Sequence, residues 1–220
     1  HAPPEKLKRH EPYIYSDSDV LALMAAAGDC RNRMTNITDP ALIGLLAVTG
    51  MRVGEAIGLE RSDFDEKRGL LRIRGENNKH GKTRLLPLHS STVAAICLYI
   101  KKRDRLLPKP KSQAVFLSSV GKRLIYENFQ FRFHRLVLSL GLNKRVPNKN
   151  PRIHDLRHTF TVKTLTAWYR EGLDTAPMLP ALSTYLGHVS PSSTYWYLSA
   201  TPELLEQACK RLEIVEGVRS

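Results

Sequence analysis

The chain has 220 residues, enough to bury a substantial core in one domain. Its 34 lysines and arginines against 21 aspartates and glutamates give a formal net charge of +13, which favours nucleic acid as a polyanionic partner over a membrane surface. The longest apolar run, Ala41 to Val48, is far shorter than the roughly 20 residues that span a bilayer. Cys30, Cys97 and Cys209 are widely spaced without a CxxC pair, which argues against a disulfide framework or a zinc site and suits a reducing cytoplasm.

Capping residues and apolar periodicity predict one compact domain that is mainly α with a small antiparallel β-sheet. Ser16 is expected to cap a first helix, and Asp39-Pro40 to begin a second, buried one. Two short β-prone runs flank the polar turn 75–82 and predict a basic hairpin. In chain order we expect a linker without a signal peptide at 1–12, helices at 20–27 and 41–48, strands at 70–74 and 83–88, helices at 93–100, 129–140 and 154–170, and a polar connector at 145–152.

Basic residues concentrate in the middle of the chain, in the segments 67–84, 101–111 and 122–152. After residue 197 the balance reverses, and the tail 203–216 carries glutamates together with apolar residues at roughly helical spacing. We therefore expect the polyanion to contact the middle of the chain and the tail to pack on protein.

Two arginines and two histidines have the chemistry needed to hold a phosphodiester. A guanidinium binds a pair of phosphate oxygens and stays charged, so Arg52 and Arg157 are candidate clamps. His154 and Arg157 are spaced i, i+3 on a predicted helix, with His158 one turn beyond His154. A metal at these histidines is a weaker reading, because no HExxH pattern or carboxylate accompanies them.

A tyrosine with an ordinary pKa near ~10 needs a proton acceptor or a cationic site to act as a nucleophile. His154 is a candidate acceptor and Lys79 a candidate cation. Each candidate also has a structural reading: an ion pair of Arg52 with Glu55 at a helix junction, Lys79 as a solvated turn residue, His188 as a helix end, and Tyr197 as one member of an aromatic core cluster with Tyr185, Tyr195 and Trp196.

Four segments occur together and in order, and their combination is more specific than any one of them. They are Thr49-Gly50-Met51-Arg52-Val53-Gly54-Glu55, Lys79-x-x-Lys82-x-Arg84-x-x-Pro87-Leu88, His154-x-x-Arg157-His158-Thr159-Phe160, and Leu186-Gly187-His188 with Tyr197 nine residues later. With these segments the chain resembles the catalytic domain of the tyrosine site-specific recombinases, the phage integrase family, over residues 13 to 210.

The resemblance implies a catalytic domain at 13–220 that binds double-stranded DNA as a homo-oligomer, with the hairpin reaching toward DNA and a C-terminal helix docking on a neighbouring protomer. It implies that Tyr197 attacks the scissile phosphate, forms a 3′-phosphotyrosyl bond and releases a 5′-hydroxyl, a transesterification that needs no metal, ATP or other cofactor. By this resemblance Arg52 and Arg157 clamp the phosphate, and His188 donates a hydrogen bond to it. Lys79 protonates the leaving oxygen, and His154 assists proton transfer from the tyrosine. Glu55 and His158 have supporting roles, and Arg72, Arg74, Lys82 and Arg84 contact DNA.

Two departures from the family pattern bear on this expectation. The family's N-terminal DNA-clamping domain does not precede residue 13, so we expect a catalytic fragment or a truncated homologue, and the stretch 171–180 looks longer than in compact members. The rival nucleophile is Tyr195, but the family's spacing from His188 selects Tyr197. The alternative functions are a noncatalytic DNA-binding module, for which the tyrosine would be unnecessary, and a type IB topoisomerase-like enzyme, which would relax any supercoiled plasmid.

Overall fold

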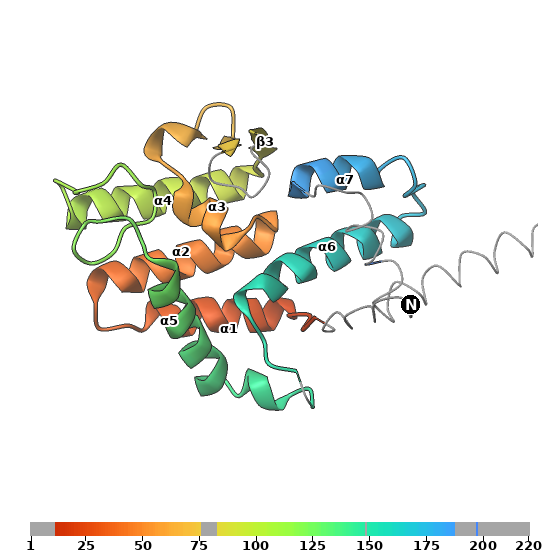
Figure 1. Cartoon of the computed structure of the whole chain (residues 1–220), viewed down its shortest axis with the longest axis horizontal. Coiled ribbons are helices and arrows are strands. Elements are labelled where there is room, and N and C mark those ends of the chain that lie inside the picture. The colour runs from red at the N-terminus through yellow and green to blue at the C-terminus, as the bar shows by residue number, and fades with distance from the viewer. Residues whose placement is uncertain (1–11, 76–82, 148, 188–196, 198–220) are drawn as a thin grey trace, which may run out of the picture.

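The computed structural model describes residues 12–75, 83–147, 149–187 and 197. In this part of the chain it is mostly helical with one three-stranded antiparallel sheet, as the sequence predicts (Figure 1). The helices are α1 (Asp17–Gly28), α2 (Arg33–Thr49), α3 (Val53–Gly58), α4 (Ser90–Leu106), α5 (Tyr126–Ser139), α6 (Ile153–Arg170) and α7 (Leu179–Leu186), with short 3-10 turns η1 (Arg61–Asp63) and η3 (Leu142–Lys144). The strands are β1 (Phe64–Asp65), β2 (Leu70–Ile73) and β3 (Arg84–Pro87).

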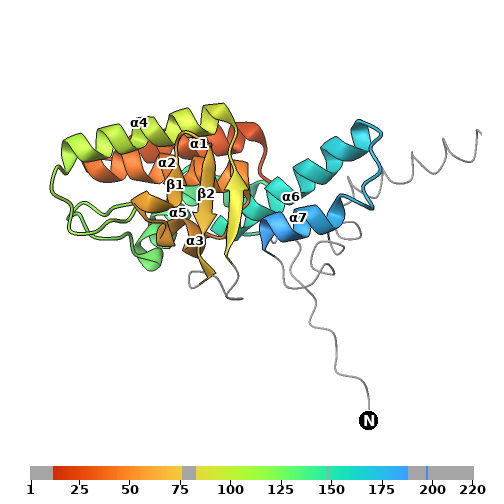
Figure 2. The same ribbon diagram turned by 90° about the horizontal axis from the view of Figure 1, so that it is seen from above.

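Helix α2 is the centre of the helical layer and packs against α1, α4 and α6. Its apolar face is continuous with the main hydrophobic core, to which Leu42, Ile43 and Leu46 contribute fully buried side chains. Figures 1 and 2 show α6 and α7 side by side at one end of the molecule, with β3 as the strand nearest to α7. Helix α6 therefore runs from the core outward to where α7 begins, and α7 runs back and ends beside β3 (Figure 1).

The start of α2 differs from the expectation that Asp39-Pro40 begins it. The helix begins at Arg33, because the Asn32 side chain accepts hydrogen bonds from the backbone amides of Met34 and Thr35 and so caps the first turn. The Asp39 carboxylate is engaged elsewhere, since the Arg132 guanidinium donates to both of its oxygens at 2.5 and 2.8 Å. The prediction of a cap at Asp39-Pro40 is wrong, and Pro40 lies inside the helix.

The other expected elements are present, with longer bounds in some cases. Ser16 caps α1 in a capping box with Asp19, and Gly141 follows α5 with a left-handed backbone (φ 65°). Strands β2 and β3 form the predicted hairpin, with Leu71 opposite Leu86. Strand β1 was not expected, because two residues are too short to show an alternating pattern.

A second, smaller hydrophobic cluster lies between α6 and α7 and includes Tyr197. Its buried members are Val162, Leu165, Leu179, Leu182, Leu186 and Tyr197. The tyrosine thus packs against α6, which carries His154, Arg157 and His158, and against α7. No helix within the described ranges is long and apolar enough to cross a membrane.

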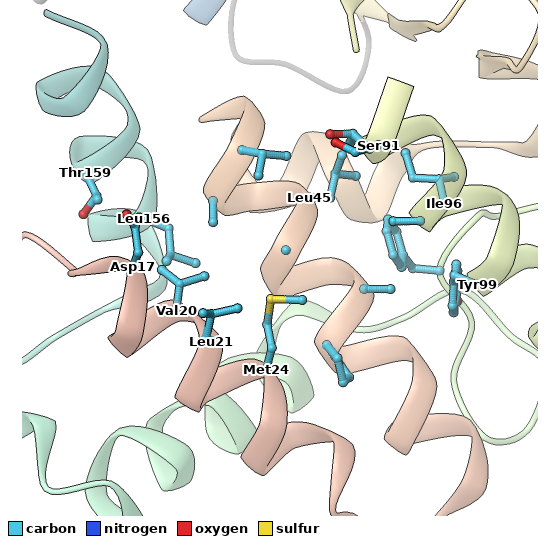
Figure 3. Close-up of a pocket in the computed structure, with 18 of the residues that line it drawn as sticks. Asp17, Val20, Leu21, Met24, Leu45, Ser91, Ile96, Tyr99, Leu156 and Thr159 are labelled. Atoms are coloured by element: carbon cyan, nitrogen blue, oxygen red, sulfur yellow. The ribbon is translucent and has the colours of Figure 1, made fainter. Parts of the chain in front are cut away.

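An apolar pocket of about 480 Å³ opens between α1, α2, α4 and α6, as Figure 3 shows. Val20, Met24 and Leu45 line it, and α6 contributes Leu156 and Thr159. None of the candidate catalytic residues lines this pocket. The candidate active site lies instead along a different strip of α6, at the end of α7.

Candidate active site

Arg52 stands at the junction between α2 and α3. Gly50 ends α2 with a left-handed backbone (φ 60°), and Arg52 then becomes the N-cap of α3. Its backbone amide donates to Glu55 Oε2 at 2.9 Å and its Nη1 to Glu55 Oε1 at 3.1 Å, while its Nη2 reaches the carbonyl of Gly187 at 3.0 Å. The ion pair at a helix junction is therefore present, and it orients a guanidinium whose side chain keeps 27% of its surface exposed.

Arg157 projects from α6 toward the same carbonyl end of α7. Its Nη1 donates to Gly50 O and its Nη2 to Leu186 O, both at 2.9 Å, and the residue is buried. Burial and the positive charge of Arg52 lower the pKa of Arg157 to about 10, so the guanidinium stays charged at neutral pH. A buried arginine held this way is preorganised for a phosphate, because its orientation is fixed before any ligand arrives.

Arg84 on β3 completes a set of three guanidiniums around α7. It donates from Nη1 and Nη2 to the two carboxylate oxygens of Glu55, at 3.0 and 2.8 Å, and from Nε to Tyr185 O at 2.9 Å. The sequence predicts Arg84 as a DNA contact, but its side chain is only 10% exposed and serves an interior ion pair. Its place in the structure is that of a link between the sheet, α3 and α7.

The three arginines therefore donate to three successive carbonyls at the end of α7, those of Tyr185, Leu186 and Gly187. The last carbonyls of a helix have no partner within the helix and form the negative end of its dipole. Guanidinium donors satisfy them and fix the backbone from which His188 follows. His188 itself, Lys79 and Lys82 lie outside the described residues, and their predicted roles stay predictions.

Glu55 balances two of these positive charges from a fully buried position. Burial raises the pKa of its carboxyl, but the hydrogen bonds and charge of Arg84, with the backbone amide and charge of Arg52, outweigh it and the net direction is downward. Glu55 is therefore an anion at neutral pH. Its carboxylate holds Arg52 and Arg84 at fixed positions, and its supporting role in catalysis stays a prediction.

The histidines of α6 lie one turn apart and contact each other and Tyr197. The rings of His154 and His158 meet edge to face at 4.7 Å between centroids, and the Nδ1 atom of His158 lies 2.6 Å from the Tyr197 hydroxyl. Tyr197 is 3% exposed. The structure thus brings the predicted nucleophile to His158, a residue to which the sequence assigns support only.

His154 faces the positive side of the site. The residue is exposed, yet partial desolvation of its ring and the charges of Arg157, Arg152 and Arg52 lower its pKa to about 4. The imidazole is therefore neutral at pH 7. A neutral ring beside these arginines can still donate a hydrogen bond to a phosphate oxygen.

The lowered pKa of His154 predicts how stability depends on pH. A histidine with a depressed native pKa takes up its proton more readily in the unfolded chain, so stability is full above about 6.5 and falls between pH 6.5 and pH 4. We expect the urea midpoint of the protein to drop between pH 7 and pH 5, and His154→Gln to flatten this drop. Equal pH dependence in the two proteins would contradict the prediction.

Of the other arginines that the sequence predicts as DNA contacts, Arg72 lies on β2 and Arg74 directly follows it. Arg72 Nε and Arg74 Nε donate to one oxygen of Asp63, at 3.0 and 2.8 Å, and Arg74 also pairs with Glu60. Arg72 keeps 48% of its side chain exposed and Arg74 26%. Both guanidiniums are thus oriented by carboxylates at the base of the hairpin, and neither Asp63 nor Glu60 carries a sequence signal for this role.

Comparisons with known proteins agree with this geometry. The pattern of the phage integrase family matches residues 15–203. The integrase/recombinase y4rB of Sinorhizobium fredii is 40% identical over 216 residues, which are 96% of this chain and 68% of that protein. The tyrosine recombinase XerC of Chlamydia muridarum is 30% identical over 202 residues, 92% of this chain and 58% of that protein.

The crystal structure of XerA recombinase superimposes with a TM-score of 0.69 at 26% identity, covering 95% of this chain and 66% of that one. The chain thus spans between 58% and 68% of the length of these three relatives. Its mainly helical architecture with a small antiparallel sheet is that of tyrosine recombinase catalytic domains. The chain belongs to the phage integrase family, the tyrosine recombinases.

Proposed function

We propose that this chain is the catalytic domain, residues 13–220, of a site-specific recombinase or integrase that cleaves and rejoins double-stranded DNA through a 3′-phosphotyrosyl intermediate. The observation that carries the proposal is the meeting of Arg52, Arg157 and the Tyr197–His158 pair at the carbonyl end of α7. The three charged or ionisable groups interact electrostatically, since Arg52 lowers and Tyr197 raises the pKa of Arg157.

The geometry supports a metal-independent and ATP-independent transesterification. Arg52 and Arg157 each use two N–H groups on protein acceptors in the contacts given above, and a guanidinium has five donors in all. The remaining donors can bind nonbridging phosphate oxygens, and one positioned donor is typically worth a factor of about 100 to 1,000 in rate. The energy of the cleaved phosphodiester is conserved in the phosphotyrosyl bond. The 5′-hydroxyl of a partner strand later attacks this bond and reverses the reaction.

We assign the other predicted residues to the same reaction. Lys79 protonates the leaving 5′-oxygen and His188 hydrogen-bonds the phosphate. Arg72, Arg74 and Lys82 of the hairpin contact the DNA backbone, while Arg84 holds Glu55 and α7. The tail 203–216 docks on a neighbouring protomer when several copies assemble on DNA, and the reaction takes place in the cytoplasm.

The proposal is tested by covalent trapping on DNA. The substrate is a pool of nicked duplexes with random flanking sequence. After cleavage the short oligonucleotide that carries the 5′-hydroxyl dissociates and rejoining cannot occur. The phosphotyrosyl product then accumulates and survives denaturing electrophoresis. We expect an adduct with the wild-type protein, none with Tyr197→Phe, and an undiminished one with the matched control Tyr195→Phe. Circular dichroism establishes that each variant is folded.

Two results would contradict the proposal: a folded wild-type protein that forms no adduct with any member of the pool, or an adduct that persists in Tyr197→Phe. An adduct lost in Tyr195→Phe but kept in Tyr197→Phe would move the nucleophile to the rival tyrosine.

A further inference from the structure

We infer that His158 is the catalytic base that accepts the Tyr197 proton, and that His154 instead faces the phosphate. The inference rests on the proposed strand cleavage and assigns a step within it. The family resemblance gives this assistance to His154, whereas the structure places the Nδ1 atom of His158 against the reacting hydroxyl.

The contact joins the two atoms between which the proton has to move. Tyr197 Oη and His158 Nδ1 are separated by 2.6 Å, a hydrogen-bond distance. The phenol donates across this contact when Nδ1 carries no proton. His158 is then the neutral tautomer with its proton on Nε2, which is the form that can act as a base.

The surroundings of Tyr197 make such an acceptor necessary. The residue is 3% exposed and packs with Val162, Leu165 and Leu186. Burial among apolar side chains disfavours the tyrosinate, so a phenol here cannot rely on bulk water to remove its proton. A base already hydrogen-bonded to the hydroxyl satisfies the geometric requirement for general base catalysis, a heavy-atom separation of about 2.6 to 3.2 Å.

His154 is suited to a different step. Desolvation and the positive charges of Arg157, Arg152 and Arg52 lower its pKa to about 4. A group with this pKa is a weak base at pH 7, but its neutral ring remains a hydrogen-bond donor. The edge-to-face contact at 4.7 Å keeps the two rings adjacent, and it is the His158 ring that contacts Tyr197.

The step is balanced in both directions. As the Tyr197 Oη–P bond forms and the P–O5′ bond breaks, the phenolic proton moves to His158 Nδ1 and gives an imidazolium, while Lys79 supplies a proton to the leaving 5′-oxygen. In rejoining, the 5′-hydroxyl gives its proton back to Lys79 as it attacks phosphorus, the P–Oη bond to Tyr197 breaks, and the imidazolium of His158 returns its proton to the departing Tyr197 oxygen. Neither direction requires an oxidant, a reductant or a metal.

The test uses a nicked duplex recovered from the adduct assay in which sulfur replaces the bridging 5′-oxygen. Sulfur leaves without being protonated, so the single-turnover rate reports on activation of the tyrosine. We expect His158→Ala to lower this rate about 100-fold or more at pH 7, and the deficit to shrink toward pH 10 as hydroxide replaces the base. His154→Ala is the matched variant, and its deficit should be the same at every pH.

Other ionisable groups near the pair are held constant by the design. Glu55 stays ionised and His154 stays neutral across this range. Arg157, with a pKa of about 10, titrates alike in the wild type and the variants, so each deficit is taken against the wild type at the same pH. His158→Gln serves as a second variant that keeps a polar side chain, and the thermal unfolding midpoint and DNA affinity of each variant show that it is folded and binds. Imidazole added to His158→Ala should restore part of the rate.

A deficit of His158→Ala that is independent of pH, no deficit at all, or a pH-dependent deficit in His154→Ala alone would each overturn the assignment. These results differ from failure of the proposed function. If strand cleavage itself is wrong, the wild-type protein forms no adduct; if only this assignment is wrong, the wild type forms its adduct through Tyr197 and the His158 variants lack the expected profile.

Discussion

Glu55→Gln is expected to lower the free energy of unfolding by about 3–5 kcal/mol, the usual result of removing one partner from a buried ion pair. The substitution preserves the shape of the side chain but removes the charge that Arg84 and Arg52 share. Arg84 would then be a buried cation without its carboxylate, beside Arg157. Strand cleavage should fall as well, because the same carboxylate orients Arg52.

The measurement is urea unfolding at pH 7, and the matched control is Glu60→Gln. Glu60 also pairs with two arginines, Arg74 and Arg123, but a third of its side chain is exposed. Solvent-accessible ion pairs contribute on the order of 1 kcal/mol or less to the free energy of unfolding. The control should therefore unfold near the wild-type midpoint. Equal losses of unfolding free energy in the two variants would show that the buried ion pairs of Glu55 contribute no more to stability than the exposed pairs of Glu60.

Gly50→Ala is the second substitution with a large expected effect. The backbone at Gly50 has φ 60°, and a Cβ atom added there would lie 2.4 Å from Cδ1 of Phe160 on α6. The left-handed backbone costs about 1–2 kcal/mol in a residue with a side chain, and the steric clash adds about 1–3 kcal/mol. Displacing Gly50 also moves the carbonyl to which Arg157 donates.

Gly141→Ala is the control because Gly141 has the same backbone class, φ 65°, but no atom within 4 Å of an added Cβ. It should show the backbone cost alone. We expect the thermal midpoint of Gly50→Ala to fall by several degrees more than that of Gly141→Ala, at roughly 2–4 °C per kcal/mol for a chain of this size. Indistinguishable midpoints would mean that Phe160 moves aside without cost.

The elements that the sequence predicts correctly are those whose signals are local. Ser16 caps α1 through an amide three residues later, and the hairpin of β2 and β3 follows from apolar runs on either side of a polar turn. The start of α2 was mispredicted at Asp39-Pro40, because the sequence does not show that Asp39 belongs to Arg132, 93 residues later. A carboxylate before proline is a cap signal only when it does not form an ion pair with a distant arginine or lysine.

The same limit applies to the active site. Arg52 and Glu55 are three residues apart, and their pairing was foreseeable as a helix-junction ion pair. The link from Arg84 to Glu55 spans 29 residues, and the contact of His158 with Tyr197 spans 39. No periodicity or spacing rule reports on such contacts, so the sequence names candidate residues for the site but not which of their atoms face one another.

The arginine contacts at the end of α7 also bear on how the chain folds. They join residues 135, 101 and 29 positions apart, and the further bond of Arg157 to Gly50 spans 107. Contacts between distant residues form late, because long loops must close before they contribute. The set of arginine contacts therefore forms only when α3, β3, α6 and α7 have all docked. A partly synthesised or partly folded chain would lack the candidate phosphate site. If the chain cleaves DNA as we propose, this topology would keep it inactive until its fold is complete.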